Sequence, residues 1–353
     1  MLTLSEIKKI IEDSGLSAQF RIDCKGQWSD FVKQEYNIPY VYTEHHVDYI
    51  DVHSHGFSGS SMDISLILYH DKKPCAVWPL MFDMTDIEPI KSINNQYGGI
   101  IIPPFFIENF PKKSQRSVVK NCLNFLNKLL GLSGGKCWRT SEVSTGGAIG
   151  QWYEIALEKG GMLDRVNYEM YVDLSMSIQE IRKCIRKSYR PLISSGLKKW
   201  KVLVMDQYCE NTWKNFRLLH KTVAGRVTRP IETWNVQHEA IKSGNAFLVH
   251  ISDKEGKMVG GGYFNMSSCE GNYSVGSYNK ELSDQPLGHM IQYQAILTMK
   301  EKGRKQYYIG SRFYIPVLPF VTEKQVNISR FKAGFSTFLL PRVTLKLTNQ
   351  RLQ

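Results

Sequence analysis

The sequence predicts an α/β protein built around a mixed sheet. Segments with the apolar period of helices alternate along the chain with short runs of β-branched and aromatic residues. Successive strand-like runs are often separated by a short charged turn rather than by a helix, as in antiparallel hairpins. The chain has 353 residues, 42% of them hydrophobic, which is enough for two domains with a buried core each. We therefore expect an α/β (α+β) fold in two parts.

Seven segments have helical periodicity and six have the composition of strands. Several helices end at a glycine that would adopt the left-handed conformation of a C-cap, namely Gly15, Gly131, Gly160, Gly196 and Gly303. Pro191 falls inside one predicted helix and should kink or restart it. The helices are predicted at residues 4–14, 114–130, 147–159, 177–195, 211–223, 231–242 and 288–302, and the strands at residues 64–69, 76–82, 246–251, 259–266, 273–278 and 307–309.

Two stretches of the chain share one plan of strand, charged turn and strand. The first turn is His70-Asp71-Lys72-Lys73-Pro74 and the second is Asp253-Lys254-Glu255-Gly256-Lys257. Helical segments precede both. The repetition predicts two similar sub-folds that meet near residues 164–167, with domains at 1–165 and 166–353. Two unrelated hairpins are the alternative interpretation.

The positive charge of the chain is concentrated in one segment. The formal net charge is +12, and residues 180–229 contain thirteen basic residues against three acidic ones. Such a segment attracts the phosphates of RNA, of a coenzyme or of a nucleotide sugar, unless it is a solvated helical surface. The aromatic residues follow a core-like period instead of interleaving with the basic ones, which argues against RNA binding as the main activity.

Composition also excludes several classes of protein. No apolar run approaches the length of a membrane-spanning helix, and the N-terminus lacks the plan of a signal peptide, so we expect a cytoplasmic protein without a membrane span. The seven cysteines are scattered without a C-x-x-C pair. His45, His46, His53 and His55 cluster in a segment that looks like a loop. We interpret it as a polar or substrate-facing loop and predict no metal site.

A strand followed by a loop and a helix N-terminus forms the candidate active region. Residues 273–278 are the strand, and Gln285-Pro286-Leu287-Gly288-His289-Met290 leads into the helix predicted at 288–302. Helix N-termini bind pyrophosphate through unpaired N–H groups. Gln285-x-x-Gly288-x-Met290 resembles the Q/R-x-x-G-x-G/A loop of GNAT acetyltransferases, with Met290 in place of a small residue. The alternative is a helix start with a purely capping role.

Further motifs resemble those of FemAB-like proteins, over about residues 28–346. Arg330-Phe331-Lys332-Ala333-Gly334-Phe335 resembles their F-K-x-G-F-G signature. Gly303 with Tyr307-Tyr308-Ile309-Gly310, the stretch 185–198 and the turn Tyr97-Gly98-Gly99 resemble three other family elements. The resemblance implies two tandem GNAT-type domains, of which residues 1–165 are degenerate and residues 166–353 form the acyltransferase.

The resemblance implies acyl transfer to an amine, and it suggests roles for individual residues. Tyr278 is the candidate acid, unless it is a core tyrosine, and His220 or Glu232 is the candidate base, unless these have capping or surface roles. Lys332 would neutralise charge on the donor or the transition state. Backbone N–H groups of the strand would polarise the carbonyl. The candidate coenzyme-binding residues are Val275, Gly276, Ser277, Gln285, Gly288 and His289.

The acceptor is expected at the connection between two helices of the second domain. Arg226, Arg229 and Trp234 would hold the phosphates and base of a nucleotide sugar, or a carboxylate, and Tyr97 is a further candidate. Capping and core packing are the alternative. The expected function is transfer of an acyl group, acetyl first of all, from acyl-CoA to an amino sugar or cell-surface glycan precursor. Two alternatives remain: a transferase that uses aminoacyl-tRNA on a peptidoglycan precursor, and a non-catalytic module that binds RNA or glycan.

Overall fold

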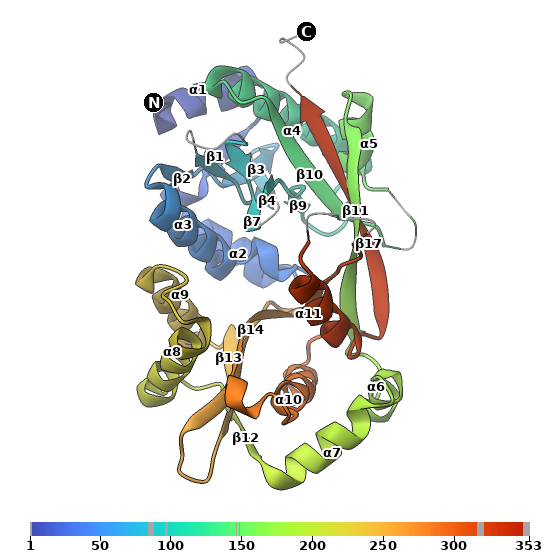
Figure 1. The fold of residues 1–353 in the computed structure, drawn as a ribbon. Helices are drawn as coiled ribbons and strands as arrows, with labels where there is room; N and C mark the ends of the chain where they lie inside the picture. The colour runs from blue at the N-terminus through green and yellow to red at the C-terminus, as the bar shows by residue number, and fades with distance from the viewer. Residues whose placement is uncertain are drawn as a thin grey trace. The chain divides into compact units, whose positions relative to one another are not determined.

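The computed structural model describes residues 2–83, 88–95, 98–145, 147, 149–315 and 321–348. It confirms the α/β class, with helices packed on mixed and antiparallel sheets (Figure 1). The chain forms two compact units, Met1–Val166 with Pro341–Gln353, and Asn167–Leu340. The last segment is therefore grouped with the first unit, whereas the sequence analysis placed it in the second domain. Strand β17 (Phe338–Thr348) carries the chain from the second unit back to the first.

The first unit contains five helices among its described residues, around a core that includes Trp78, Phe125 and Trp138. Its sheets are antiparallel, and one has the strand order β1-β3-β4-β9. The helices are α1 (Leu4–Asp13), α2 (Lys25–Gln34), α3 (Glu44–Ser58), α4 (Lys112–Ser133) and α5 (Gln151–Glu158). The strands are β1 (Ala18–Phe20), β2 (Ser61–Asp63), β3 (Leu66–His70), β4 (Lys73–Trp78), β5 (Met81–Asp83), β6 (Ile90–Lys91), β7 (Ile93–Asn95), β8 (Gly98–Ile100), β9 (Phe105–Phe106) and β10 (Cys137–Val143), which pairs with β17.

The second unit has a sheet in the order β11-β16-β15-β14-β13-β12. All neighbours are antiparallel except β15 and β16, which run parallel. Its strands are β11 (Met162–Asp173, which begins in the first unit), β12 (Lys201–Met205), β13 (Ala246–Ser252), β14 (Met258–Met266), β15 (Glu270–Tyr278) and β16 (Gln306–Arg312). Its helices are α6 (Ile178–Cys184), α7 (Tyr189–Lys199), α8 (Glu210–Ala224), α9 (Ile231–Lys242), α10 (Leu287–Glu301) and α11 (Glu323–Ala333).

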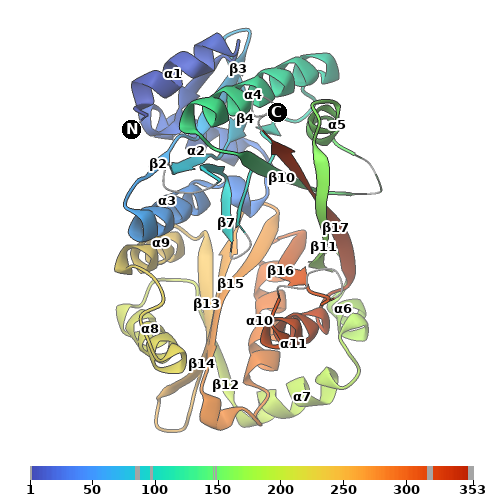
Figure 2. The same cartoon turned by 45° about the horizontal axis from the view of Figure 1, so that its top comes forward.

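Helices cover both faces of this second sheet. In Figures 1 and 2, α8 and α9 lie on one side of β13–β15, and α7 and α10 lie on the other. Glycines of β14 make room for both layers. A Cβ on Gly261 would lie 2.6 Å from the Phe216 ring of α8, and a Cβ on Gly262 would lie 2.7 Å from Ile291 of α10. The glycine run in this strand therefore lets both helices pack directly against the backbone.

Several local predictions are confirmed and others are wrong. The two repeated stretches are antiparallel hairpins, β3–β4 and β13–β14. The predicted helix at 177–195 breaks into α6 and α7, and Pro191 lies in the first turn of α7, where its missing N–H costs nothing. Gly131 does not end a helix, because α4 continues to Ser133 and is capped by Gly134 at φ +70°. Gly196 lies inside α7.

The histidine-rich segment is also a helix rather than a loop. Thr43 accepts a hydrogen bond from the backbone N–H of His46 and so caps α3, while Gly59 ends the helix at φ +68°. Val47 and Ile50 are buried on its inner face. The clustered histidines therefore lie on a helix. Because they are polar, they hide the apolar helical spacing of Val47 and Ile50 in the sequence.

Candidate active site

The two parallel strands of the second unit part from each other, and the candidate site begins where they do. The register of β15 and β16 joins Glu270–Asn272 to Gln306–Tyr308. Beyond these residues β15 continues to Tyr278 beside β14, and β16 continues to Arg312 beside β11. Residues 273–278 of β15 are therefore paired with β14 but not with β16.

One buried and two partly buried tyrosines, Tyr307 with Tyr273 and Tyr278, occupy the α10 side of this divergence. The hydroxyls of Tyr273 and Tyr278 lie 3.1 Å apart, and the hydroxyl of Tyr307 donates to Oε1 of Gln292 at 2.6 Å. A Cβ on Gly276 would collide with the Tyr273 hydroxyl, so glycine is needed there. Burial raises the pKa of all three tyrosines, and Tyr278 therefore keeps its proton at neutral pH. No role was predicted for Tyr273, Tyr307 or Gln292, because each has a partner on another element of the fold.

Lys332 of α11 reaches the same cluster. Its Nζ lies 4.8 Å from the centre of the Tyr273 ring. It also lies close to Gly310, which has φ +127°, and a Cβ at that position would be 3.1 Å from Nζ. Burial lowers the pKa of Lys332 to about 8, an effect that Glu169 partly opposes. The resemblance to FemAB-like proteins singled out this lysine, and the structure places it beside Tyr273.

Glu169 of β11 supplies the negative charge near Lys332. It is 1% exposed and accepts hydrogen bonds from the Tyr308 hydroxyl at 2.5 Å and the Ser311 hydroxyl at 2.9 Å. The register of β11 with β16 shifts beside it, between Met170 and Tyr171, as at a β-bulge. The sequence analysis missed Glu169. The available signal was a single acidic residue within an apolar run.

Glu169→Gln should move the alkaline limit of activity to lower pH. The amide still accepts the two hydroxyl hydrogen bonds, but it removes the charge that favours the Lys332 ammonium, so the lysine loses its proton earlier. The pH profile of kcat/KM measures the shift. Glu255→Gln, in the exposed turn between β13 and β14, makes the same change in net charge and should leave the profile alone. If the alkaline limit of the profile is the same in Glu169→Gln as in the wild type, the carboxylate does not influence the pKa of Lys332.

The N-terminus of α10 is partly covered by aromatic side chains. A Cβ on Gly288 would lie 3.2 Å from the Phe331 ring and 3.5 Å from that of Tyr278. The His289 ring packs edge-on against Tyr189 at 4.4 Å, and burial, with Arg186 nearby, lowers its pKa to about 4. His289 is therefore a neutral packing residue in this structure.

Two further residues of this loop have partners within the chain. Gln285 accepts a hydrogen bond from Lys199 at 2.7 Å and donates one to Asp284 at 2.6 Å. Met290 is fully buried, and a Cβ on Gly196 of α7 would lie 2.6 Å from its sulfur. The close packing of α7 on α10 therefore occupies the place where the GNAT loop has a small residue.

Val275 and Ser277 direct their side chains to the opposite face of the sheet. Val275 packs against the cluster that includes Trp213 and Phe216, and Ser277 pairs with Gly261, whose missing Cβ would face Phe216. Only the backbone of these two residues is left to face the divergence.

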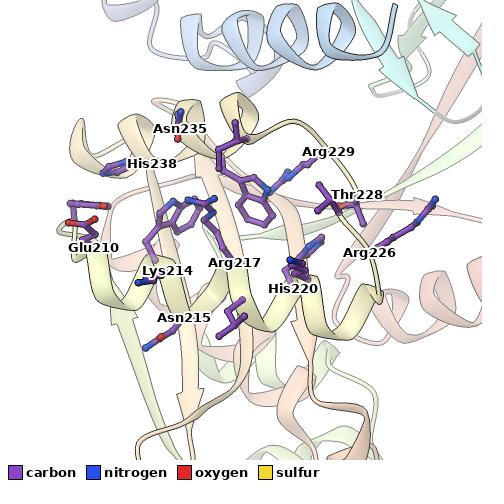
Figure 3. Close-up of a pocket in the computed structure, with 17 residues that line it drawn as sticks. Glu210, Lys214, Asn215, Arg217, His220, Arg226, Thr228, Arg229, Asn235 and His238 are labelled. Atoms are coloured by element: carbon purple, nitrogen blue, oxygen red, sulfur yellow. The ribbon is translucent and has the colours of Figure 1, made fainter.

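A cavity lies between α8, α9 and their connection, on the face of the sheet opposite to the tyrosine cluster. It encloses about 730 Å³. Figure 3 shows side chains from all three segments around it. The lining residues are Tyr208, Glu210, Trp213, Lys214, Asn215, Arg217, Leu218, His220, Lys221, Arg226, Val227, Thr228, Arg229, Ile231, Trp234, Asn235 and His238. We call this hollow the basic cavity, since it has five lysines and arginines against one glutamate.

Arg229 is held at this cavity by two contacts. Its guanidinium carbon lies 3.6 Å from the centre of the Trp234 ring, and its Nη2 donates to Oε1 of Gln237 at 2.7 Å. The His220 ring meets Trp234 edge-on at 5.1 Å. Burial and the charge of Arg229 lower the pKa of His220, which leaves it neutral at pH 7. The structure thus brings His220, the candidate base, together with the three residues predicted for the acceptor, Arg226, Arg229 and Trp234.

Other candidates lie elsewhere. Glu232 is exposed in the first turn of α9 and is not among the residues that line the basic cavity. Tyr97 lies outside the described residues. Among the described residues, no group of three or more His, Cys, Asp and Glu side chains is placed to hold a metal ion.

The basic segment does not form one continuous surface. Arginines of α6, α7 and their connection bind within the protein: Arg182 donates to Ser194, Arg186 to Tyr189, and Arg190 to the Ile185 carbonyl. The remaining basic residues of α8 and its connection line the basic cavity. A solvated helical surface, the alternative interpretation of this segment, is therefore only partly present at α6 and α7: Lys183 and Lys187 are exposed, whereas the arginines bind neighbouring residues.

Comparisons with solved structures cover nearly the whole chain. FemX has 13% sequence identity and a TM-score of 0.67, over 93% of this chain and 96% of that chain. L-PGS from Bacillus licheniformis has 12% identity and a TM-score of 0.57, over 92% of each. A tandem GNAT protein from the clavulanic acid biosynthesis pathway has 10% identity and a TM-score of 0.52, over 95% of this chain and 98% of that chain. This chain has the FemX-like tandem GNAT fold. No family model and no curated protein sequence matches it.

The FemX-like fold accounts for the element order of the second unit. The expected succession of two helices, three strands, a helix and a strand is present as α8, α9, β13, β14, β15, α10 and β16. The expectation of a FemAB-like, tandem GNAT fold is thereby confirmed at the level of fold. None of the helices that the structure describes is both long and apolar enough to cross a membrane.

Proposed function

We propose that the chain is an acyltransferase that moves an acyl group from an activated carrier to an amine. One observation carries the proposal: a partly buried lysine, Lys332, lies over the ring of Tyr273, whose hydroxyl is within 3.1 Å of that of Tyr278, where β15 and β16 part. A carbonyl bound in that space would meet fixed donors in a setting with little water, where charge on the transition state is stabilised most.

The proposed reaction is direct attack of the amine on the activated carbonyl. The new C–N bond forms as the bond from carbon to the leaving group breaks. The Lys332 ammonium stabilises the developing negative charge, and Tyr278, protonated at neutral pH, gives its proton to the leaving group. His220, which lines the basic cavity on the other face of the sheet, is the candidate base for an amine presented from that cavity, because its neutral form accepts a proton.

The basic cavity is the proposed acceptor site. Arg226 and Arg229 suit the phosphates of a nucleotide-linked or glycan amino sugar, and Trp234 offers an aromatic surface already stacked with Arg229. The acceptor would be a precursor of the cell envelope or of a surface glycan. In this assignment residues 1–165 are a degenerate GNAT-like domain, residues 166–353 hold the chemistry, and the protein acts in the cytoplasm.

The donor we propose is acetyl-CoA or another acyl-CoA, with its pyrophosphate at the N-terminus of α10. Gln285 and Gly288 occupy the positions of the GNAT loop there. One observation favours the alternative, an aminoacyl-tRNA donor used on a peptidoglycan precursor: Met290 is packed against Gly196, which hinders close approach of a pyrophosphate. Exposed Lys183 and Lys187, on and just after α6, would suit the phosphates of tRNA.

Calorimetric titration with acetyl-CoA and with a pool of aminoacylated tRNA distinguishes the donors. Binding of acetyl-CoA alone supports the first proposal, and binding of tRNA alone replaces it with the alternative. Binding of neither would point to a non-catalytic module that recognises RNA or glycan on the same fold.

Gly288→Glu should abolish acetyl-CoA binding if the α10 N-terminus holds the pyrophosphate. The new carboxylate would lie at the N–H groups of the first turn and would repel the phosphates. Gly26→Glu is the matched control, since Gly26 is also the second residue of a helix and has open space around it. Both variants are compared by thermal melting before titration, because a side chain at 288 would crowd Phe331. A folded Gly288→Glu protein with unchanged affinity would remove this loop from the donor site.

A further inference from the structure

Exposed aliphatic side chains and unpaired basic side chains share the rim of the basic cavity. Leu218 is 62% exposed, Val227 is 71% exposed and Ile231 is 44% exposed, and all three line it. Large apolar side chains that gather in one exposed place mark interaction surfaces more often than isolated ones do. The question is what kind of partner this combination fits.

Helix α8 places Leu218 and three basic residues in a single stripe. Lys214, Arg217, Leu218 and Lys221 have the spacing i, i+3, i+4 and i+7, which places them on one face of the helix. The inner face of the same helix is buried through Trp213 and Phe216. The outward stripe therefore presents a leucine surrounded by three cations.

The cations of the rim are not neutralised by the protein. Within the part of the chain that the structure describes, no salt bridge is recorded for Lys214, Arg217, Lys221 or Arg226. Their charges are therefore available to an anionic partner. The other large side chains exposed at the rim are aliphatic, whereas stacking on nucleic-acid bases uses aromatic ones.

Apolar surface extends beyond the rim on the same helix. Leu218 also borders a neighbouring hollow of about 300 Å³, which is lined by Leu219, Val223 and Met258 and also by polar residues that include Lys257 and Glu281. An aliphatic chain that met Leu218 would find some further apolar surface on the side away from the basic cavity.

We propose that the rim of the basic cavity docks on an anionic phospholipid bilayer. The lysines and arginines would bind lipid phosphates, while Leu218, Val227 and Ile231 enter the boundary between headgroups and acyl chains. This combination of cations with a few inserted aliphatic residues is the way interfacial segments bind membranes without spanning them. The inference does not depend on the proposed acyl transfer, because docking requires no reaction.

Sedimentation with vesicles tests the proposal on the full chain. We expect binding to vesicles of equal parts phosphatidylglycerol and phosphatidylcholine, and little binding to phosphatidylcholine alone. The double variant Lys214→Gln/Arg226→Gln should bind about 30-fold more weakly. The double variant Leu218→Ser/Val227→Ser should lose about tenfold and keep its dependence on salt.

Matched controls lie on other surfaces of the same unit. Leu192→Ser/Leu197→Ser removes two leucines of α7, each 39% exposed, and Lys254→Gln removes an exposed lysine in the turn between β13 and β14. Neither should change vesicle binding. All altered side chains are exposed, so unchanged melting temperatures are expected.

Three results would overturn the proposal. The first is absence of binding to anionic vesicles. The second is unchanged vesicle binding by Leu218→Ser/Val227→Ser together with tight binding of tRNA, which would make the rim a nucleic-acid surface. The third is complete release from vesicles by inorganic pyrophosphate with the aliphatic variant unaffected, which would make it a site for small free phosphates.

Discussion

Lys332→Met should lower kcat by about two to three orders of magnitude while the protein stays folded. The side chain keeps its length but loses the ammonium that faces the Tyr273 ring and the space between β15 and β16. Loss of one charged donor at a developing oxyanion typically costs about 10²–10³ in rate. Methionine also suits this partly buried position, because an apolar group of similar size removes the cost of desolvating the charge. Initial rates with saturating donor, and a melting curve, measure the two effects.

The pH dependence of stability gives an independent readout for the same lysine. Its pKa falls from the ordinary value of 10.5 to about 8 on folding, so the native state holds its proton less tightly than the unfolded chain. The cost of the buried charge is therefore complete below pH 8, and it is relieved as pH rises from about 8 to 10.5. Wild type should gain stability relative to Lys332→Met across that window. Activity of the wild type should fall over the same range, since the charged form is the useful one.

Lys324→Met, near the start of α11, is the matched control because Lys324 is exposed on the same helix. It should change neither the rate nor the stability profile. Equal rate losses in the two variants would show that the charge of α11 as a whole matters. An unaffected Lys332→Met would remove the lysine from the proposed mechanism.

Local pattern predicted some of the elements around the site, but not α11 and β11, which carry Lys332 and Glu169. The predicted helix at 231–242 matches α9, and the predicted strands at 246–251 and 259–266 fall on β13 and β14. These segments carry strong apolar periods, and they pack the way those periods require. Arg229 and Trp234 were grouped correctly for a simple reason: residues five apart, at a helix start, stay close in any fold.

The packing of α7 on α10 explains two unusual features of the sequence, Gly196 and Met290, which their neighbours in sequence do not explain. Gly196 looks like the end of a helix, and Met290 looks like a defect in a phosphate-binding loop. In the structure they face each other, and the missing side chain of Gly196 makes room for Met290 where α7 crosses α10. The glycine serves a helix crossing rather than a left-handed turn. Neither the role of Gly196 nor that of Met290 can be inferred from the residues adjacent to it in sequence.

Glu169 is another residue whose role depends on contacts that are distant in sequence. It lies more than 130 residues from both Tyr308 and Ser311, and only the pairing of β11 with β16 brings them together. Sequence spacing predicts contacts along a helix or strand, whereas the polar groups that tune a buried lysine come from the topology of the sheet.

Arg229→Lys should raise the KM for the acceptor by about 10- to 100-fold and leave kcat nearly unchanged. The guanidinium lies flat enough against Trp234 to bring its carbon within 3.6 Å of the ring centre, and it donates to Gln237 while facing the basic cavity. A lysine keeps the charge but loses the stacked plane and the forked geometry that binds phosphate or carboxylate through two hydrogen bonds. The loss therefore falls on binding in the ground state and the transition state alike, which appears in KM.

A control variant and an NMR titration distinguish binding of the acceptor by Arg229 from a purely structural role of this residue. Arg182→Lys is matched, because Arg182 also lies over an aromatic ring, that of Tyr293, and donates to a side chain, Ser194, but it lies on α6. It should leave KM unchanged. Arg229→Ala should in addition raise the pKa of His220, since Arg229 is one of the two causes that lower it, and this is measurable by NMR titration of the imidazole. A raised His220 pKa with an unchanged acceptor KM would mean that Arg229 organises the cavity but that the acceptor binds elsewhere.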